Sequence, residues 1–262
     1  MSDPILIIEV LGRSEQGATR PFLCRGEDKQ LYYVKGRYAG LRSLCCEWVA
    51  GRLAQEMGLA TPEIAMVEVP EKLIKGSDRP DIQDLGVGLA FGSARVEGAQ
   101  EVTWEASREV SPDEKARILL LDWWVQNEDR TLSACGGNPN LLVTPVEREW
   151  ENDLFDDLGS RRSKLWTFDF NLAFDVLFDD DVFWDGHLFA PERTRWLPAF
   201  RSEMEKKMEW ILGRFLLIWA ELPPEWLYID ADENLPMQLD LDVVMEVLRR
   251  PFDRPAEFWR ER

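Results

Sequence analysis

The stretch Asn127-Glu128-Asp129-Arg130-Thr131 decides the fold of this chain when it is taken with two later segments, Asn138-Pro139-Asn140-Leu141-Leu142-Val143 and Phe168-Asp169-Phe170. The three segments supply, in order, an acid, a carboxamide that opens an apolar strand, and a second acid between aromatic residues. Transfer of a phosphoryl group needs an oxygen base near the acceptor and oxygen ligands for magnesium. The order of the segments therefore predicts that they meet at one site of that kind.

Each polar residue in these segments also has an ordinary alternative role. Asp129 follows a predicted helix, so it is either a base for an acceptor hydroxyl or a helix-terminal acid. Arg130 either steadies the loop or neutralises phosphate. Asn140 offers a neutral oxygen and Asp169 a charged one, and two such ligands suit magnesium, which keeps waters and borrows phosphate oxygens. The alternative is three unrelated polar residues.

Two upstream residues favour the first interpretation. Lys35 closes a predicted strand at residues 31–35, where a lysine can pair with nucleotide phosphates. Glu47 on the following helix can hold that lysine by an ion pair. The ordinary alternatives are a solvated lysine at a strand end and a surface glutamate. The turn at residues 14–19 contains one glycine, Gly17, which makes it a weak phosphate-loop candidate beside an ordinary hairpin.

The composition argues against several classes of protein. The 262 residues carry a formal net charge of −18, which disfavours general nucleic-acid binding because phosphate backbones attract excess lysine and arginine. The first ten residues lack the basic start of a signal peptide, and no window is apolar enough for a membrane span. Four cysteines without CxxC pairing and a single histidine argue against zinc, and we expect reduced thiols in the cytoplasm.

The first hundred residues are predicted to form strands around one helix. Strands are expected at residues 5–11, 20–25, 31–35 and 62–69. Apolar residues at helical spacing predict a helix at 41–57, with Gly58 as its C-terminal cap. Residues 70–86 are polar and rich in proline and glycine, which predicts a surface loop.

The remainder is predicted to be mostly helical. Ser111 and Pro112, followed by two acids, begin a helix that should end near Gln126. Short strands are expected at 141–144 and 164–169 with an exposed charged excursion between them, and amphipathic helices at 202–221 and 241–250.

Five segments together resemble the HipA-like kinases, a group distantly similar to phosphatidylinositol kinases and eukaryotic protein kinases. They are Tyr33-Val34-Lys35, Glu47-Trp48-Val49-Ala50-Gly51-Arg52-Leu53-Ala54, and the three segments quoted first. The resemblance runs from about residue 5 to residue 174 and continues more weakly through the C-terminal helices. It implies an α+β, two-lobed protein-kinase-like fold, with an N-terminal antiparallel sheet and one helix at 1–98 and a mostly helical lobe at 99–262.

The resemblance also implies roles for individual residues. Its catalytic and metal assignments are Lys35 for the nucleotide, Glu47 as its partner, Asp129 as catalytic acid or base with Arg130 beside it, and Asn140 and Asp169 for Mg²⁺. The family's phosphate loop falls on residues 14–19, with Ser14, Gln16, Gly17 and Thr19 as ATP contacts and Ser14 or Thr19 as autophosphorylation sites. Residues 89–93 would form the hinge reached by adenine, through Phe91 and Gly92.

The chain departs from the family pattern in three ways. Residues 132–137 lengthen the catalytic loop, which leaves open whether Asn138 or Asn140 binds the metal. The phosphate loop is poor in glycine. The chain begins almost at the kinase lobe, without the extra N-terminal subdomain of toxin-type members. We therefore expect a stand-alone kinase domain and carry over neither a toxin role nor an antitoxin partner.

The sequence thus predicts an ATP- and Mg²⁺-dependent kinase that phosphorylates serine or threonine on a protein, itself included. A small-molecule or lipid acceptor stays within the same class, and neither the protein substrate nor the oligomeric state is encoded in a motif. One alternative is a catalytically weak pseudokinase that acts as a nucleotide-binding or protein-interaction module. The other is a non-enzymatic acidic interaction protein whose twelve tryptophans form a partner surface.

Overall fold

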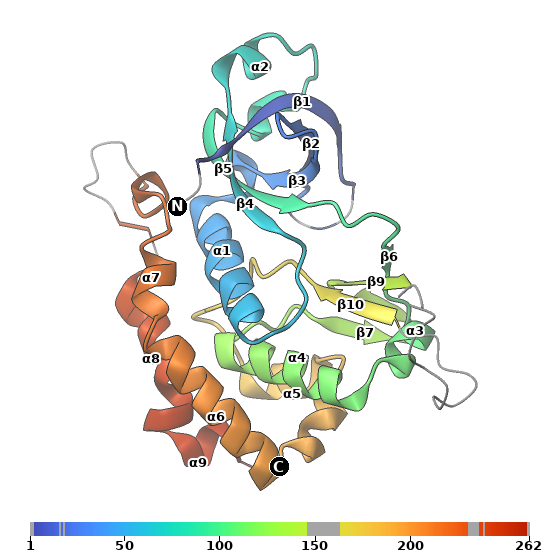
Figure 1. The fold of residues 1–262 in the computed structure, drawn as a ribbon, viewed down its shortest axis with the longest axis vertical. Helices are drawn as coiled ribbons and strands as arrows, with labels where there is room; N and C mark the ends of the chain where they lie inside the picture. Colours follow the sequence, from blue (N-terminus) through green and yellow to red (C-terminus); the bar gives the residue numbers. More distant parts are fainter. Residues whose placement is uncertain are drawn as a thin grey trace, which may run out of the picture.

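The computed structural model of the chain describes residues 3–15, 17, 19–145, 163–229, 236–237 and 239–260. The fold is mixed α+β, with a closed five-stranded β-barrel at one end and helices at the other (Figure 1). The charged excursion was predicted at residues 145–163, and its residues 146–162 lie outside the described residues. Its two end residues, Pro145 and Ser163, belong to strands.

The barrel contains the strands predicted in the first hundred residues and one more. Its members are β1 (Ile5–Arg13), β2 (Phe22–Gly26), β3 (Leu31–Lys35), β4 (Ile64–Val69) and β5 (Gly88–Ala94). Their order is β1-β2-β3-β5-β4, and β1 and β4 run parallel and close the sheet. The predicted antiparallel sheet was wrong on this point. Closure satisfies the backbone groups that an open sheet would leave at its edges.

The segment at residues 70–86 was wrongly predicted to be a surface loop. It forms α2 (Glu71–Lys75) and the 3-10 turn η2 (Ile82–Asp84). Its buried side chains Ile74, Ile82 and Leu85 belong to the core inside the barrel. The approach is close, since a Cβ on Gly36 would lie 1.9 Å from the Leu85 carbonyl oxygen. The segment is mostly polar and turn-forming, so the sequence did not indicate that these three apolar side chains would be buried.

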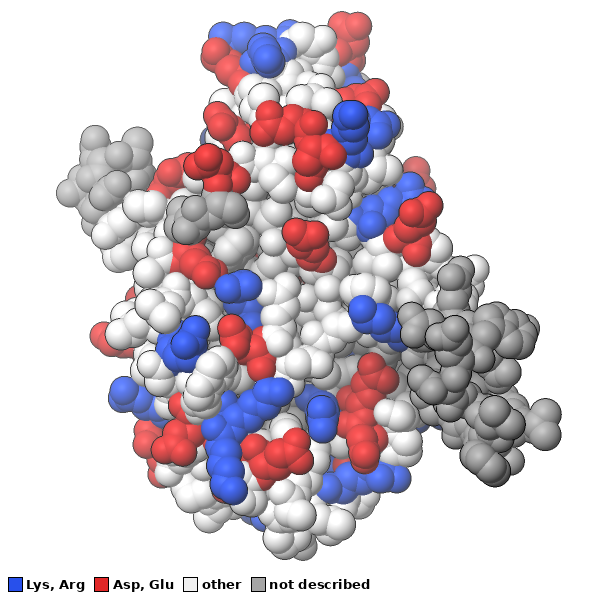
Figure 2. Space-filling view, viewed as in Figure 1, with Lys and Arg blue, Asp and Glu red and all other residues white. Residues whose placement is uncertain are grey.

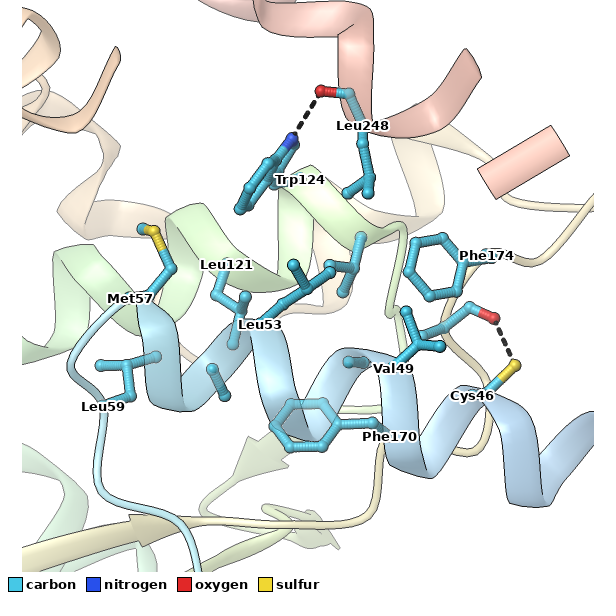
Figure 3. Packing of buried hydrophobic residues seen from close by; sticks show 14 of the residues in the cluster. Cys46, Val49, Leu53, Met57, Leu59, Leu121, Trp124, Phe170, Phe174 and Leu248 are labelled. Carbon is cyan, nitrogen blue, oxygen red and sulfur yellow. Dashed lines mark hydrogen bonds between the residues drawn. The ribbon is translucent and has the colours of Figure 1, made fainter. Parts of the chain in front are cut away.

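A second core joins α1 (Leu41–Glu56) to the helical part of the molecule. In Figure 3, Val49 and Leu53 of α1 pack toward Leu121 and Trp124 of α4 (Pro112–Val125). The Trp124 indole N–H donates to the Leu248 carbonyl at 2.9 Å, which adds α8 (Leu241–Asp253) to the same core. The helix predicted at 41–57 is confirmed, and Gly58 follows it with a φ of 80°.

The predicted start and end of α4 are also confirmed. The Ser111 hydroxyl accepts the Glu114 N–H at 3.2 Å, which satisfies a backbone donor that the first turn leaves free. The helix ends at Gln126, whose φ of 54° turns the chain out of the helix axis. The segment from Asn127 onward therefore leaves α4 directly as a loop.

Short strands lie between the barrel and the helices (Figure 1). A three-stranded sheet contains β6 (Gln100–Glu101), β9 (Leu141–Pro145) and β10 (Ser163–Thr167), and a hairpin contains β7 (Thr131–Ser133) and β8 (Gly136–Asn138). The helix α3 (Trp104–Glu109) follows β6. The strand predicted at 164–169 ends earlier because Asp169 has a φ of 58°, which no strand accommodates.

The C-terminal part is a series of short helices along one side of the molecule (Figure 1). They are α5 (Asp180–Gly186), η3 (Ala190–Arg195), α6 (Pro198–Leu212), α7 (Phe215–Trp219), η4 (Pro224–Trp226), α8 and α9 (Pro255–Phe258). The single helix predicted at 202–221 was wrong, because the chain breaks between α6 and α7 at Gly213, a poor helix former. Among the described residues, the helices are all too short or too polar to cross a membrane.

Candidate active site

A cavity of about 460 Å³ collects most of the predicted site residues. Its walls come from the barrel, from α1, from the connection after β5 and from the β9–β10 region. The predicted residues that line it are Ser14, Gly17, Thr19, Lys35, Glu47, Phe91, Asn140 and Asp169, and Asn138 lines it as well. Residues separated by more than a hundred positions therefore share one space.

Lys35, Glu47 and Asp169 form a buried ion-pair triad beside this cavity. The Lys35 ammonium contacts the Glu47 carboxylate and lies 2.6 Å from Asp169 Oδ1. The other Glu47 oxygen, Oε2, accepts the Phe170 N–H at 3.1 Å. Glu47 is 2% exposed, so its carboxylate reaches the site through the core rather than from solvent. The surface-glutamate alternative is excluded.

The charges of Lys35 and Asp169 stabilise each other, whereas burial raises the pKa of Glu47 to about 7 against the opposing effect of Lys35. Burial alone would lower the pKa of Lys35, but the Glu47 and Asp169 carboxylates outweigh it and raise that pKa above its ordinary value. Burial likewise acts to raise the pKa of Asp169, and the Lys35 ammonium more than offsets it, so the Asp169 pKa is lowered. Asp169 is therefore an anion at neutral pH.

Asp169 and Asn140 both adopt an uncommon backbone conformation. Their φ angles are 58° and 47°, in the left-handed region that non-glycine residues rarely enter. The Phe168 N–H donates to the Asn140 carbonyl at 3.2 Å, which ties the two turns together. Backbone strain of this kind persists where the surrounding structure holds it, and it clusters at functional sites.

Asp129 lies between the two candidate asparagines. Its Oδ2 accepts the side-chain amides of Asn138 and Asn140, each at 3.0 Å. The added loop residues fold as the β7–β8 hairpin, which pairs Thr131 with Asn138 and returns the chain to the site. Each side-chain amide donates an N–H to Asp129, so the side-chain oxygen of each asparagine is left to bind a metal. The structure brings both asparagines to the site.

The pKa of Asp129 is raised above its ordinary value. Burial is the main cause, and it outweighs the two asparagine hydrogen bonds, which act in the opposite direction. The nearby Asp169 carboxylate adds to the increase. A raised pKa suits a carboxylate that accepts a proton during catalysis.

Arg130 lies beneath the loop rather than in the cavity. It is fully buried, and its guanidinium donates to Asp122 Oδ2 at 2.7 Å and to the Pro139 carbonyl at 3.1 Å. It also donates to the backbone carbonyl of Asn140. These contacts support the first of its two predicted roles, that of steadying the loop. They leave its guanidinium turned toward protein carbonyls and a carboxylate.

The sequence did not reveal Asp122 and His187, which complete this support. Asp122 Oδ1 accepts the Asn127 amide at 2.9 Å, and Oδ2 contacts His187 Nε2 at 3.0 Å. The Phe189 N–H donates to His187 Nδ1 at 3.0 Å, so the ring proton lies on Nε2. Burial lowers the pKa of His187, which is therefore neutral. The one sequence signal was an acid inside the apolar stretch of α4.

The candidate phosphate loop forms one edge of the cavity. Ser14, Gly17 and Thr19 line it, whereas Gln16 lies outside the described residues. The loop is closed at its base, where the Ser14 N–H donates to the Pro21 carbonyl at 2.8 Å. Gly17 has a φ of 76°, which glycine adopts at low cost.

The structure separates the two residues predicted on β5. Alternate residues of a strand face opposite sides, so Phe91 faces the cavity while Gly92 faces the barrel interior. A Cβ on Gly92 would lie 2.6 Å from Val67 Cγ1. The connection after β5, which the sequence did not single out, lines the cavity through Arg95, Val96, Gly98 and Ala99.

The donor set at the site fits a divalent cation of the magnesium type. The described residues contain no cluster of three or more histidine, cysteine or acidic side chains near enough to hold a metal by themselves. Magnesium commonly takes one or two protein oxygens and completes its shell with phosphate and water. The Asp169 carboxylate and an asparagine carbonyl supply oxygens of this kind.

Comparison with known proteins agrees with this geometry. A search among curated proteins gave no match. The family description that matches is HipA-like kinase, over residues 7–262. That range begins two residues into β1 and includes the rest of the barrel, the cavity and the C-terminal helices. Every residue of the triad and of the Asp129 loop lies within it. The chain therefore belongs to the HipA-like kinase family, as its motifs predicted.

Proposed function

We propose that this protein transfers the γ-phosphoryl group of ATP to a serine or threonine hydroxyl on a protein, with Mg²⁺ as cofactor. The observation that carries the proposal is that Lys35 and Asp169 line one cavity and contact each other, in a chain of a kinase family. Asp129 does not itself line the cavity, but it binds two asparagines that do. In this proposal residues 1–98 and 99–262 act as the two lobes on either side of the nucleotide.

The side chains have complementary tasks in such a transfer. Lys35 holds a positive charge beside the cavity and pairs with nucleotide phosphates, while Glu47 fixes its position. Asp129, oriented by two asparagine amides, accepts or orients the proton of the acceptor hydroxyl. Arg130 and Asp122 keep the loop in shape from below. Catalysis then depends on positioning and charge neutralisation rather than on a covalent intermediate.

The metal would be held by Asp169 together with Asn140 or Asn138. When bound, Mg²⁺ supplies neutralisation of phosphate charge, which is needed because the cavity itself is acidic. Its lining contributes the cations Lys35 and Arg95 against the anions Glu47, Glu101 and Asp169. A triphosphate without a cation would meet net repulsion there.

The acceptor is proposed as an alcohol on a protein. A carboxylate with a raised pKa suits removal of a proton from a hydroxyl, and Asp129 is only partly buried, so an acceptor can reach it. The family likeness favours a protein acceptor, and the chain's own Ser14 and Thr19 are candidate sites because they line the cavity.

The test is transfer of labelled phosphate from ATP by the purified chain, to itself and to candidate proteins. We expect transfer by the wild type and a loss of at least about a hundredfold in Asp129→Ala and Asp169→Ala. Asp242→Ala is the matched control, because it removes the same group from an exposed position on α8 outside the cavity lining.

Wild-type rates in both site variants would overturn the proposal. Binding of MgATP without any transfer, seen as a thermal shift, would instead identify the chain as a nucleotide-binding pseudokinase. Absence of both would favour a non-enzymatic interaction protein.

A further inference from the structure

The position of Glu47 depends on α1, and the C-terminal part of the chain contacts α1 on a face that points away from Glu47. On a helix each residue is rotated by roughly 100° from the one before it. Cys45, Trp48 and Arg52 therefore lie together on a face turned roughly 100° to 160° away from Glu47. Whatever binds this face sets the rotation and depth of α1, and with them the reach of the Glu47 carboxylate to Lys35.

Glu221, just after α7, binds two of these residues with a single carboxylate. Its Oε2 accepts the Trp48 indole N–H at 3.1 Å and the Arg52 Nε at 3.1 Å. Its Oε1 accepts Arg52 Nη2 at 3.2 Å. The arrangement is a two-point arginine–carboxylate pair, which fixes orientation as well as distance. The side chains of Arg52 and Glu221 are 33% and 26% exposed, so this ion pair is partly shielded from solvent.

Trp226, in η4, joins the same face of α1 to the barrel. Its carbonyl accepts the Cys45 thiol at 3.7 Å, and its indole N–H donates to the Leu89 carbonyl of β5 at 3.3 Å. The side chain is 1% exposed. Pro223 and Pro224 stand between Glu221 and Trp226 and restrict the backbone that connects them.

We infer that Glu221 and Trp226 are positioning residues for the Lys35–Glu47 pair, and that the protein holds α1 in its working position with its own C-terminal segment. We name this segment, residues 215–226, the α1 clamp. The inference rests on the proposed kinase function for its effect on turnover. The predicted effect on α1 is independent of the proposed function, because the position of α1 is a property of the fold alone.

The test uses the full chain with Glu221→Gln and the matched control Glu225→Gln. Both variants lose one negative charge in the same connection, but Glu225 is exposed and forms no ion pair or side-chain hydrogen bond with the described residues. Trp226→Phe is the second variant, and it removes the indole N–H with a modest loss of volume. Trp210→Phe, at an exposed position on α6 outside the α1 clamp, is its control.

Hydrogen–deuterium exchange gives the readout that needs no activity. Backbone amides of α1 should exchange faster in Glu221→Gln and in Trp226→Phe than in the two controls, while exchange in α4 stays the same. Equal α1 exchange in each variant and its control would overturn the inference. This result decides the matter even if the wild type proves to transfer no phosphate, in which case only the proposed function fails.

Kinetics separates positioning from general destabilisation. The kcat of Glu221→Gln should fall about tenfold, because small displacements of catalytic groups are costly. In a Glu47→Gln background the same change should have almost no further effect, since the residue that it positions is gone. A full tenfold additional loss in that background would show that Glu221 acts only on overall stability and would contradict the inference.

Discussion

At the scale of single residues, the contact between Asp129 and two asparagines leaves a choice that experiment can make. Asn140 is 3% exposed and its backbone carbonyl accepts a hydrogen bond from Arg130, which holds the residue in place, whereas Asn138 is half-buried at the end of a hairpin. The more tightly held amide is the better ligand, because preorganised oxygens bind a metal without reordering. We therefore propose Asn140 as the neutral metal ligand and Asn138 as an orienting partner of Asp129.

This assignment predicts different effects of two alanine substitutions. Asn140→Ala should raise the Mg²⁺ concentration needed for half-maximal activity about tenfold or more, because a metal ligand is lost. Asn138→Ala should lower kcat and leave the Mg²⁺ dependence close to that of the wild type. Magnesium titrations of the phosphate-transfer rate measure both. The reverse pattern would move the metal to Asn138.

His187 gives a prediction about stability and pH. In the folded chain burial lowers its pKa, while in the unfolded chain the ring takes up a proton near about pH 6.5. At pH values between the lowered pKa of the folded state and the pKa of the unfolded state, the unfolded state binds more protons than the folded state. The free energy of unfolding therefore falls as the pH falls below about 6.5. His187→Gln removes this contribution.

The measurement is urea denaturation of both proteins from about pH 5 to 8. The difference in unfolding free energy between wild type and His187→Gln should change across the acid half of this range and be constant above it. His187 is the chain's only histidine, which makes the comparison clean. A difference that is independent of pH would show that His187 does not stay neutral in the fold.

Residue-scale contacts divide clearly into those that could be predicted and those that could not. Lys35, Asp129, Asn140 and Asp169 could be found because their order and spacing along the chain follow a family pattern. The pairing of Asp122 with His187 could not, because 65 positions separate them and nothing local marks either residue. Long-range contacts of this kind depend on the packing of α4 against the connection after α5.

At the scale of elements, β5 shows how strand alternation assigns its residues. Phe91 and Gly92 are neighbours in sequence, yet one lines the cavity and the other packs inside the barrel. We predict that Gly92→Ala lowers the free energy of unfolding by roughly 1 to 3 kcal/mol through overpacking against Val67. Its KM for ATP should remain that of the wild type.

Phe91→Leu is the companion variant, because it changes the cavity wall and conserves an apolar side chain. It should alter the KM for ATP with a smaller effect on stability. Thermal unfolding and ATP titrations of both variants check the pair. An increased KM in Gly92→Ala without a loss of stability would return Gly92 to the nucleotide site.

Elements were predictable where their signals are local. The start of α4 is set by Ser111 and its acids, and its end by Gln126, all within one continuous segment. The break at Gly213 was hidden because Met208, Ile211 and Phe215 keep helical spacing across it. The buried turn at residues 82–85 was hidden because its anchors are sparse among polar residues.

At the scale of the whole molecule, two features go beyond what the sequence allowed. The parallel pairing of β1 with β4 closes the barrel and depends on the register of Ile5 with Val67. The core around α1 continues into α4 and α8, so the helix that carries Glu47 is packed against the helical part of the chain. Closure and packing of this kind depend on three-dimensional fit rather than on local pattern.

The surface of the molecule is acidic overall but mixed in detail. Figure 2 shows acidic and basic side chains interspersed over one face, with no broad field of basic residues among the described atoms of that face. The net charge of −18 would favour approach of basic acceptor proteins over acidic ones through long-range attraction. The lining of the cavity is acidic as well, so in the proposed function binding of the nucleotide would depend on its metal.

The central claim is that Asp169 and an asparagine of the Asp129 loop hold a metal-bound nucleotide beside Lys35. A crystal structure with a non-hydrolysable ATP analogue and Mn²⁺, whose anomalous signal marks the metal, tests it directly. We predict a manganese peak in contact with the Asp169 carboxylate and the Asn140 amide oxygen, with the phosphates near the Lys35 ammonium. A nucleotide bound outside this cavity, or a metal with no contact to Asp169, would contradict the account.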